Sequence, residues 1–218
     1  MHWILDFDDT LVLGPNTWAF QEVLPTLIRN HGLPYDKALF DRVMLQAQER
    51  ANEDEQEEEL LNFVFDTLNW PDELKADLID QVYNGYQPRL FDDALPFLDF
   101  IQKQGHSIYM ISNNNHAVSL AEMLGIKAYF SAIVTPKQSD SRAKPQRDMW
   151  DKLQSEYHLT GAIYMVGDDP WSDGTFSQRA GISCWIIDRL TRYTSLHAAM
   201  PYQWAQTFDE ITLSLTAD

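Results

Sequence analysis

Short apolar segments separated by polar turns recur along the chain and predict buried β-strands. The first, HWILDFD at residues 2–8, has consecutive apolar residues rather than a strict alternation, which is typical of a strand buried on both faces of a parallel sheet. Similar segments return in the C-terminal part of the chain. The five predicted strands are residues 2–8, 107–113, 131–135, 162–168 and 183–188.

Helical patterns lie between the later strands. ALPFLDFIQKQG, residues 94–105, has apolar residues three and four positions apart and ends at a glycine, and HAVSLAEMLG, residues 116–125, does the same. An alternation of strands and helices builds a sheet with helices on both faces. The sequence therefore predicts an α/β fold with a doubly wound, Rossmann-like parallel sheet.

Residues 15–88 interrupt this alternation, because they carry helical signals and no convincing strand. We expect Pro25 to kink the first of four helices, and Pro71 to lie in the first turn of the fourth, where acids face the positive end of the helix. The four predicted helices are residues 18–32, 35–50, 55–69 and 70–86. The expected domains are an α/β core of residues 1–14 and 89–218 and a helical insert between them.

Composition and charge narrow the class of protein. A chain of 218 residues can form one substantial domain that carries a smaller one. The formal net charge of -17 repels nucleic acid phosphates and anionic membrane surfaces, so we expect neither as a partner. The single cysteine, Cys184, excludes an intrachain disulfide and suits a reducing compartment, and we expect it to pack as a small buried hydrophobe.

Membrane and export signals are not evident in the sequence. No apolar run approaches the roughly 18 residues that a membrane-spanning helix needs. The N-terminal stretch MHWILDFDD has no basic start, and acids interrupt its apolar segment, unlike a signal peptide. We therefore expect a cytoplasmic protein, either a monomer or a weak homodimer.

Polar residues gather where the predicted strands end. In open parallel sheets, ligands bind at the carboxyl ends of the strands, so these residues are expected to meet at one edge of the sheet. Clustered carboxylates repel one another, and such a cluster either faces water or holds a cation. The first strand ends in Asp6, Phe7, Asp8, Asp9 and Thr10, the second in Ser112, Asn113 and Asn114, and the fourth in Gly167, Asp168 and Asp169, with Asp173 shortly after; Lys144 stands between the third and fourth strands, before Pro145.

Four motifs in this order make the chain resemble the haloacid dehalogenase-like hydrolase superfamily. DFDDT matches the DxDxT signature, ISN the Ser/Thr motif of the second strand, AKPQRDMW the lysine-proline segment, and VGDDPWSDGTFSQRAG the GDxxxxD motif. The resemblance spans essentially the whole chain and is to phosphatases with a helical cap inserted after the first strand. It implies a haloacid dehalogenase-like core, with residues 15–88 as the cap.

The resemblance also implies catalytic roles. Asp6 would attack phosphorus and form an aspartyl-phosphate. Asp8 lies two residues along an extended segment and points to the same side, so it would protonate the departing alcohol and later take a proton from water. Lys144 would neutralise the phosphate and the nucleophile, and Ser112 would hold phosphate oxygens.

Further site residues follow from the same resemblance. Phe7 and Asn113 are additional candidates for substrate binding, and Lys144 is a candidate for both catalysis and binding. Asp6, Asp168 and the main-chain carbonyl of Asp8 offer the hard oxygen ligands that suit Mg²⁺. The residues expected behind these ligands, in the second layer around the site, are Thr10, Asp169 and Asp173.

One position departs from the family pattern. The residue after Asp8, commonly glycine in the family, is Asp9 here, and we expect it to be an exposed turn residue.

Four functions are compatible with the motifs to different degrees: three enzyme activities and a catalytically silent scaffold. A carbon-halogen hydrolase of the same fold needs no proton donor, because halide leaves as a stable anion, so Asp8 favours a phosphatase. A phosphomutase shares all four motifs, and a catalytically silent scaffold would typically lack one charged member. The sequence therefore favours a Mg²⁺-dependent phosphatase acting on a small phosphorylated metabolite.

Overall fold

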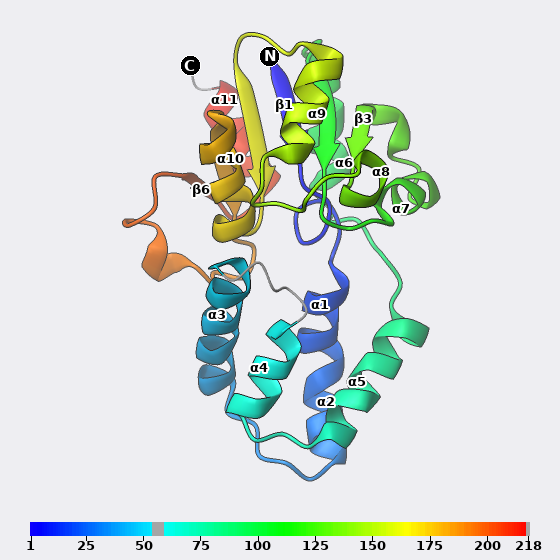
Figure 1. The fold of residues 1–218 in the computed structure, drawn as a ribbon, viewed down its shortest axis with the longest axis vertical. Helices are drawn as coiled ribbons and strands as arrows, with labels where there is room; N and C mark the ends of the chain where they lie inside the picture. The colour runs from blue at the N-terminus through cyan, green and yellow to red at the C-terminus, as the bar shows by residue number, and fades with distance from the viewer. Residues whose placement is uncertain (54–58, 217–218) are drawn as a thin grey trace. The chain divides into compact units, whose positions relative to one another are not determined.

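A computed structural model describes residues 1–53 and 59–216. The chain divides into two compact units, one formed by Met1–Leu13 with Pro88–Asp218 and the other by Gly14–Gln87. We refer to them as the core unit and the helical unit. Figure 1 shows that the core unit contains the sheet and that the helical unit is built from helices.

The sheet of the core unit has six parallel strands in the order β3-β2-β1-β4-β5-β6. The first strand lies in the interior of the sheet, where Ile4 pairs with Tyr109 on one side and with Met165 on the other. The strands are β1 (His2–Leu5), β2 (Ser107–Ile111), β3 (Phe130–Val134), β4 (Ile163–Gly167), β5 (Ser183–Ile187) and β6 (Gln203–Ala205). The five predicted strands are confirmed, and the short edge strand β6 was not predicted.

Helices cover both faces of the sheet. Trp3 and Leu5 of β1 point to the face packed by α6, α7 and α11, whereas Ile4 points to the face packed by α9 and α10. Figure 1 shows α9 and α10 in front of the strands. The helices of the core unit are α6 (Ala94–Lys103), α7 (Ala117–Met123), α8 (Pro136–Ser139), α9 (Asp148–Tyr157), α10 (Thr175–Ala180) and α11 (Phe208–Thr216). The doubly wound α/β fold is thus confirmed.

Three short helical turns connect these elements. They are η2 (Lys127–Tyr129), η3 (Pro170–Gly174) and η4 (Thr194–Leu196). Of these, η3 follows directly after the carboxyl end of β4 and is a π-helical turn.

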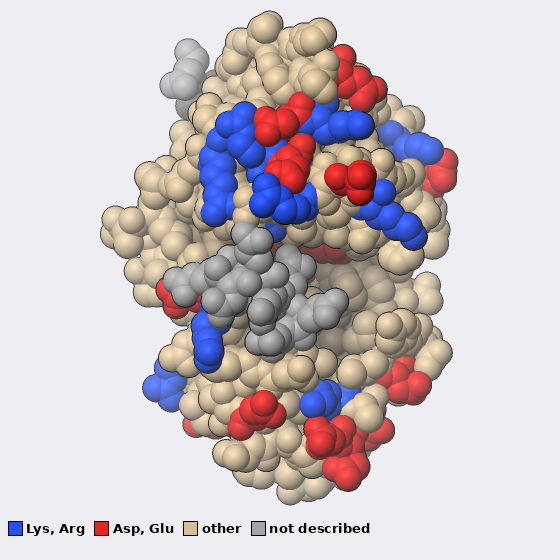
Figure 2. Space-filling model, viewed as in Figure 1, with Lys and Arg blue, Asp and Glu red and all other residues tan. Residues whose placement is uncertain are grey.

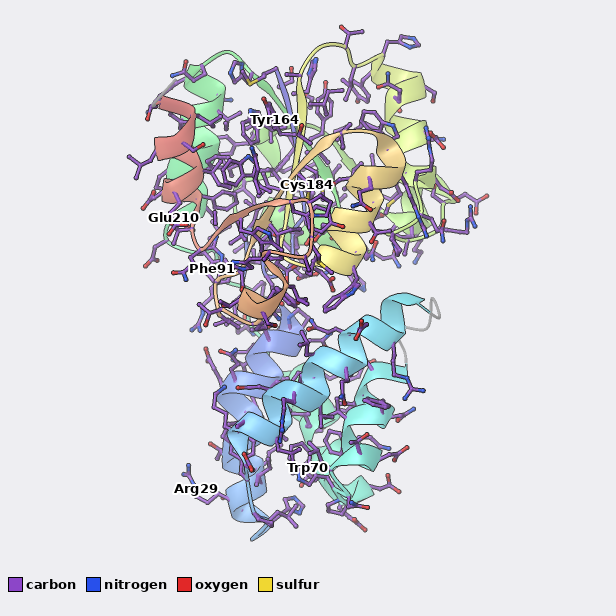
Figure 3. All side chains as sticks on the ribbon, turned by 90° about the vertical axis from the view of Figure 1, so that its left-hand side faces the viewer. Arg29, Trp70, Phe91, Tyr164, Cys184 and Glu210 are labelled. Carbon is purple, nitrogen blue, oxygen red and sulfur yellow. The ribbon has the colours of Figure 1, made fainter. Side chains whose placement is uncertain are left out.

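The helical unit has its own apolar core. Leu24, Val43, Phe65 and Leu78 are buried together, and Trp70 packs edge-on against Phe65 with 5.4 Å between ring centroids. Figure 3 shows Trp70 among the side chains of this unit. Its elements are α1 (Pro15–Trp18), η1 (Ala19–Val23), α2 (Leu24–Asn30), α3 (Lys37–Glu53), α4 (Glu59–Thr67) and α5 (Asp72–Gly85).

The two prolines singled out in the sequence mark irregular positions. Pro25 is the second residue of α2, which follows the π-helical turn η1, and this turn interrupts the predicted helix. A proline has no N–H to donate to the preceding turn, which explains the interruption. Pro71 is the N-cap of α5 rather than a residue of its first turn, so that expectation was wrong by one position, while Asp72 and Glu73 do occupy the first turn.

Cys184 is buried in the apolar layer between β5 and α10, as expected, and Figure 3 shows it inside the core unit. Burial raises the pKa of its thiol to about 12. In the described part of the chain, no helix combines the length and the hydropathy needed to cross a membrane.

Charged side chains of both signs interleave on the face of the core unit drawn in Figure 2. Exposed ion pairs of α9 and the segment before it have this arrangement, with Arg142 against Asp148 and Arg147 against Asp151. Water and salt screen exposed pairs of this kind, so they contribute little to the stability of the protein.

Candidate active site

Asp6 lies at the carboxyl end of β1, where the chain leaves the sheet. Its N–H still donates to the carbonyl of Val166 on β4 at 2.9 Å, and this contact fixes the position from which the side chain extends. The side chain is buried, and its Oδ1 accepts a hydrogen bond from Nζ of Lys144 at 2.6 Å. The same ammonium group donates to Oδ1 of Asp173 at 2.5 Å. Lys144 therefore bridges carboxylates that follow two neighbouring strands.

Asn113 fixes the backbone of Lys144. Its Nδ2 donates to the carbonyl of Lys144 at 3.1 Å, and its Oδ1 accepts from the N–H of Lys144 at 2.7 Å. Both ends of the amide are thus used to hold the loop before α9, in which the Lys144-Pro145 peptide bond is cis. The substrate contact expected of Asn113 from the sequence would have to come from its backbone or from the second N–H of its amide.

Gly167 allows Asp173 to reach the lysine. A Cβ on Gly167 would lie 2.1 Å from Cγ of Asp173, which is far inside van der Waals contact. Oδ2 of Asp173 also accepts from the N–H of Asp169 at 3.1 Å, so both oxygens of this buried carboxylate are held by the protein. The glycine before the acidic pair in this motif is therefore required for space rather than for backbone conformation.

Asp169 forms the turn that places Asp173. Its Oδ1 accepts from the N–H groups of Trp171 at 2.8 Å and Ser172 at 3.1 Å, and so it caps η3. Burial raises its pKa to about 6.

Asp168 makes a contact that the sequence did not suggest. Its Oδ2 accepts from Nη2 of Arg192 at 2.8 Å. The backbone of this arginine is held by the buried carboxylate of Asp188, which accepts from the N–H groups of Arg192 at 2.7 Å and Tyr193 at 2.9 Å. Asp188 is the last residue of the fifth predicted strand and Arg189 follows it, so the expectation that ligands bind at strand ends, applied to this strand, points to the same loop.

Asp8 is held from the loop after β2. Nδ2 of Asn114 donates to its Oδ2 at 2.9 Å, while its Oδ1 is buried and has no hydrogen-bond partner within the described residues. The N–H of Asn114 donates to Oγ of Ser112 at 3.1 Å, which leaves the hydroxyl proton of this buried serine available for another acceptor. Asn114 stands at the end of the second predicted strand, and the sequence predicts no role for it.

Three of the acids form a cluster that can hold a cation. Asp6, Asp168 and Asp173 each offer a carboxylate oxygen within 4.8 Å of one another, and all three are buried. Carboxylate oxygens are the ligands that Mg²⁺ prefers. The ligand expected from Asp8 is a main-chain carbonyl, which does not belong to this side-chain cluster.

The electrostatics of the cluster favour an added cation. Burial raises the pKa of Asp6 to about 8, against the opposing effect of Lys144, and raises that of Asp8 to about 6. Burial also raises the pKa of Asp168 well above its ordinary value, with a further contribution from the charge of Asp9. Burial alone would lower the pKa of Lys144, but the charges of Asp173 and Asp6 outweigh it and keep the ammonium protonated. The donor set and its excess of negative charge therefore fit a divalent metal ion.

The remaining predicted residues lie in the loop after β1. The side chain of Phe7 is fully buried in the sheet core, so only its backbone could contact a substrate. Thr10 is also fully buried, and its carbonyl accepts from Nη2 of Arg189 at 2.9 Å.

Asp9 is half-buried rather than exposed, and its φ of 55° lies in the left-handed region. Glycine adopts this region readily, which explains why it is common at this position in the family that the chain resembles.

The fold recurs in solved structures. The candidate HAD (haloacid dehalogenase) hydrolase YfnB from Bacillus subtilis, bound to magnesium, is 19% identical with a TM-score of 0.70, and the alignment covers 98% of this chain and 97% of that one. A HAD phosphatase from Thermococcus onnurineus is 18% identical with a TM-score of 0.61, at 98% and 97% coverage. A candidate β-phosphoglucomutase from Thermotoga maritima is 16% identical with a TM-score of 0.67, at 99% and 98% coverage. At these identities the similarity establishes the fold alone.

Comparison with curated proteins gave no significant match. The family model described as haloacid dehalogenase-like hydrolase, in contrast, matches residues 2–181, which include every strand of the sheet from β1 to β4 and all the candidate site residues up to Asp173. The six-stranded parallel sheet and the helical insert after β1 agree with that match. The chain belongs to the haloacid dehalogenase-like hydrolase family.

Proposed function

We propose that the protein is a Mg²⁺-dependent phosphatase that hydrolyses a small phosphate monoester through an aspartyl-phosphate on Asp6. The observation that carries this proposal is the buried contact of 2.6 Å between Lys144 and Asp6, with Asp8 two residues further along the same loop. It places a fixed positive charge beside a carboxylate at the carboxyl end of the sheet. An attacking carboxylate, a cation and a proton carrier are the groups that phosphoryl transfer to a carboxylate requires.

In the first step, a carboxylate oxygen of Asp6 attacks phosphorus, and the bond from phosphorus to the alcohol oxygen breaks. The departing oxygen takes a proton from Asp8, whose raised pKa of about 6 suits a general acid near neutral pH. Lys144 stabilises the charge on the phosphoryl oxygens and favours the ionised form of Asp6, against the effect of burial. The products of this step are the free alcohol and an aspartyl-phosphate.

In the second step, water attacks phosphorus and gives its proton to the carboxylate that Asp8 became in the first step. The bond between phosphorus and Asp6 breaks, so inorganic phosphate leaves and Asp6 is restored. The hydroxyl of Ser112 donates to a phosphate oxygen in both steps, since its oxygen already accepts the N–H of Asn114. Each step moves one proton, and Asp8 ends in the state in which it began.

A magnesium ion bound by Asp6 and Asp168, together with the carbonyl of Asp8, would supply positive charge to the phosphoryl oxygens. The two oxygens of Asp173 accept hydrogen bonds from Lys144 and from the N–H of Asp169. These contacts support a role for Asp173 in positioning the residues around the metal rather than in binding the metal directly. Asp169 likewise serves as the cap of η3.

We assign different roles to the two parts of the chain. We assign residues 1–14 and 89–218 as the catalytic domain, because this part carries all four motifs, and residues 15–88 as the cap. The substrate is a phosphate ester of a small molecule. We expect the residues that select this substrate to lie in the cap.

A screen of phosphate monoesters with the purified protein tests this proposal. Sugar phosphates, nucleotides, phosphoglycolate and 4-nitrophenyl phosphate are assayed for release of inorganic phosphate with Mg²⁺ and with a chelator. We expect release that requires Mg²⁺ and that is lost in Asp6→Asn but kept in Asp209→Asn, a change of an exposed acid in α11. No release from any ester would favour a silent scaffold, and formation of an isomeric phosphate ester without release would identify a mutase.

A further inference from the structure

The loop after β2 contains three consecutive asparagines, Asn113, Asn114 and Asn115, and the second of them contacts Asp8 across 106 positions of sequence. We propose that Asn114 is a positioning residue that orients the carboxyl group of Asp8 for proton transfer. This inference rests on the proposed phosphatase function. It assigns a role to a residue that neither the motifs nor the family match singles out.

The orientation of the Asn114 amide is determined by a backbone group. Its Oδ1 accepts from the N–H of His116 at 2.8 Å, and a backbone N–H can only donate. The NH₂ end must therefore be the end that faces Asp8, which fixes the choice between the two amide orientations. The N–H of Asn114 itself donates to Oγ of Ser112 at 3.1 Å, so the backbone of the residue is held as well.

This contact distinguishes the two oxygens of Asp8. Oδ2 receives the amide proton at 2.9 Å, and Oδ1 has no hydrogen-bond partner within the described residues although it is buried. An amide NH₂ donates but does not accept, so a proton on the carboxyl group belongs on Oδ1. Oδ1 is therefore the oxygen of Asp8 that remains to exchange a proton with the leaving group and, in the second step, with water.

The neighbouring asparagine provides a matched control. Oδ1 of Asn115 accepts from the N–H of Lys137 at 2.8 Å, and Asn115 is exposed. Asn115→Ala removes an amide of the same kind from the same loop without touching Asp8. Asn114→Ala removes the contact with Asp8, and a comparison of thermal unfolding temperatures separates loss of folding from loss of function.

The test compares two esters that differ in their need for a proton. The phenolate of 4-nitrophenyl phosphate leaves without protonation, whereas the alkoxide of ethyl phosphate requires it. The value of kcat/KM reports only the steps up to loss of the alcohol, so it isolates the acid role of Asp8. We expect Asn114→Ala to lower kcat/KM for ethyl phosphate about tenfold more than for 4-nitrophenyl phosphate, and Asn115→Ala to lower the two values equally.

The outcomes separate this inference from the function on which it rests. Equal losses for both esters in a folded Asn114→Ala protein would mean that the amide has only a structural role, and would overturn the inference while the phosphatase activity stands. A normal kcat/KM for both esters would overturn it as well. An unaltered protein that releases phosphate from neither of these esters, nor from any ester of the screen above, would overturn the proposed function and the inference together.

Discussion

Arg192 donates from Nη2 to Oδ2 of Asp168 at 2.8 Å, and so a guanidinium group contacts one of the three carboxylates that can hold a cation. The backbone of Arg192 is held in place as well, because Oδ1 of Asp188 accepts a hydrogen bond from its N–H. A guanidinium cannot lose its charge in a protein. A metal ion bound to Asp168 therefore shares this carboxylate with a permanent positive charge.

Replacing Arg192 by glutamine should tighten Mg²⁺ binding about tenfold, because a repelling charge near the metal is removed. The same change should lower the stability of the metal-free protein, since buried acids lose a compensating cation. Calorimetric titration of the chelator-treated protein with Mg²⁺ measures the first effect, and thermal unfolding without metal measures the second. Arg192→Lys keeps the charge and serves as the control, and equal Mg²⁺ affinities in the glutamine and lysine variants would contradict this account.

The stability of the metal-free protein should fall as pH rises from about 4 to about 8. The pKa values of Asp6 and Asp8 are raised to about 8 and about 6, above the ordinary value of about 3.9 in an unfolded chain. Over this range the folded protein holds protons that the unfolded chain has released, so the free energy of unfolding decreases with increasing pH. Urea unfolding at a series of pH values with a chelator present checks the sign.

Asp6→Asn should reduce this slope, whereas Asp209→Asn should leave it unchanged. A free energy of unfolding that is constant or rises over the same pH range would contradict burial as the cause of the raised pKa values.

Gly167→Ala should disable the site. Its Cβ would lie 2.1 Å from Cγ of Asp173, so the carboxylate must move and its contact with Lys144 is lost. We expect a loss of about 3 kcal/mol in the free energy of unfolding and of at least about 100-fold in kcat/KM. Urea unfolding and steady-state kinetics measure the two effects.

A double-mutant cycle assigns the cause of that loss. In an Asp173→Gly background the obstructing side chain is absent, so the added Cβ should cost much less stability. An equal cost of Gly167→Ala in both backgrounds would show that the clash with Asp173 is not responsible.

Asp9 should tolerate glycine better than valine. Its φ of 55° is adopted readily by glycine and at a steric cost by a β-branched residue. Asp9→Val should therefore be less stable than Asp9→Gly by about 1 kcal/mol. Both variants lose the same carboxylate, so thermal or urea unfolding of the pair isolates the backbone effect, and equal stabilities would show that this conformation is not retained.

The sequence was most informative where local patterns decide structure. Consecutive apolar residues predicted five of the six strands of the sheet, and the helical insert was predicted from helical patterns in a segment without such runs. The edge strand β6 was missed because it has only three residues, Gln203–Ala205, and its pairing with β5 is a tertiary contact that no local pattern reveals.

The site residues that escaped prediction are those whose partners are distant in sequence. Arg192 lies four residues beyond Asp188 in a loop with no motif, and Asn114 contacts Asp8 only because β1 and β2 are neighbours in the sheet. Asn113 belongs to the ISN motif and its binding of substrate stays a prediction, but its contact with the backbone of Lys144 could not be predicted from the motif. Motifs thus identify the reacting groups better than the residues that orient them.

Acid quenching during turnover tests the central proposal most directly. The protein is mixed with Mg²⁺ and a phosphate ester that it hydrolyses, denatured within the steady state, digested and examined by mass spectrometry. We predict a phosphoryl group on the peptide that contains Asp6, assigned to that residue by fragmentation and missing when Asp6→Asn is treated in the same way. Hydrolysis that proceeds while Asp6 remains unmodified, with the phosphoryl group on another residue or on none, would contradict covalent catalysis by Asp6.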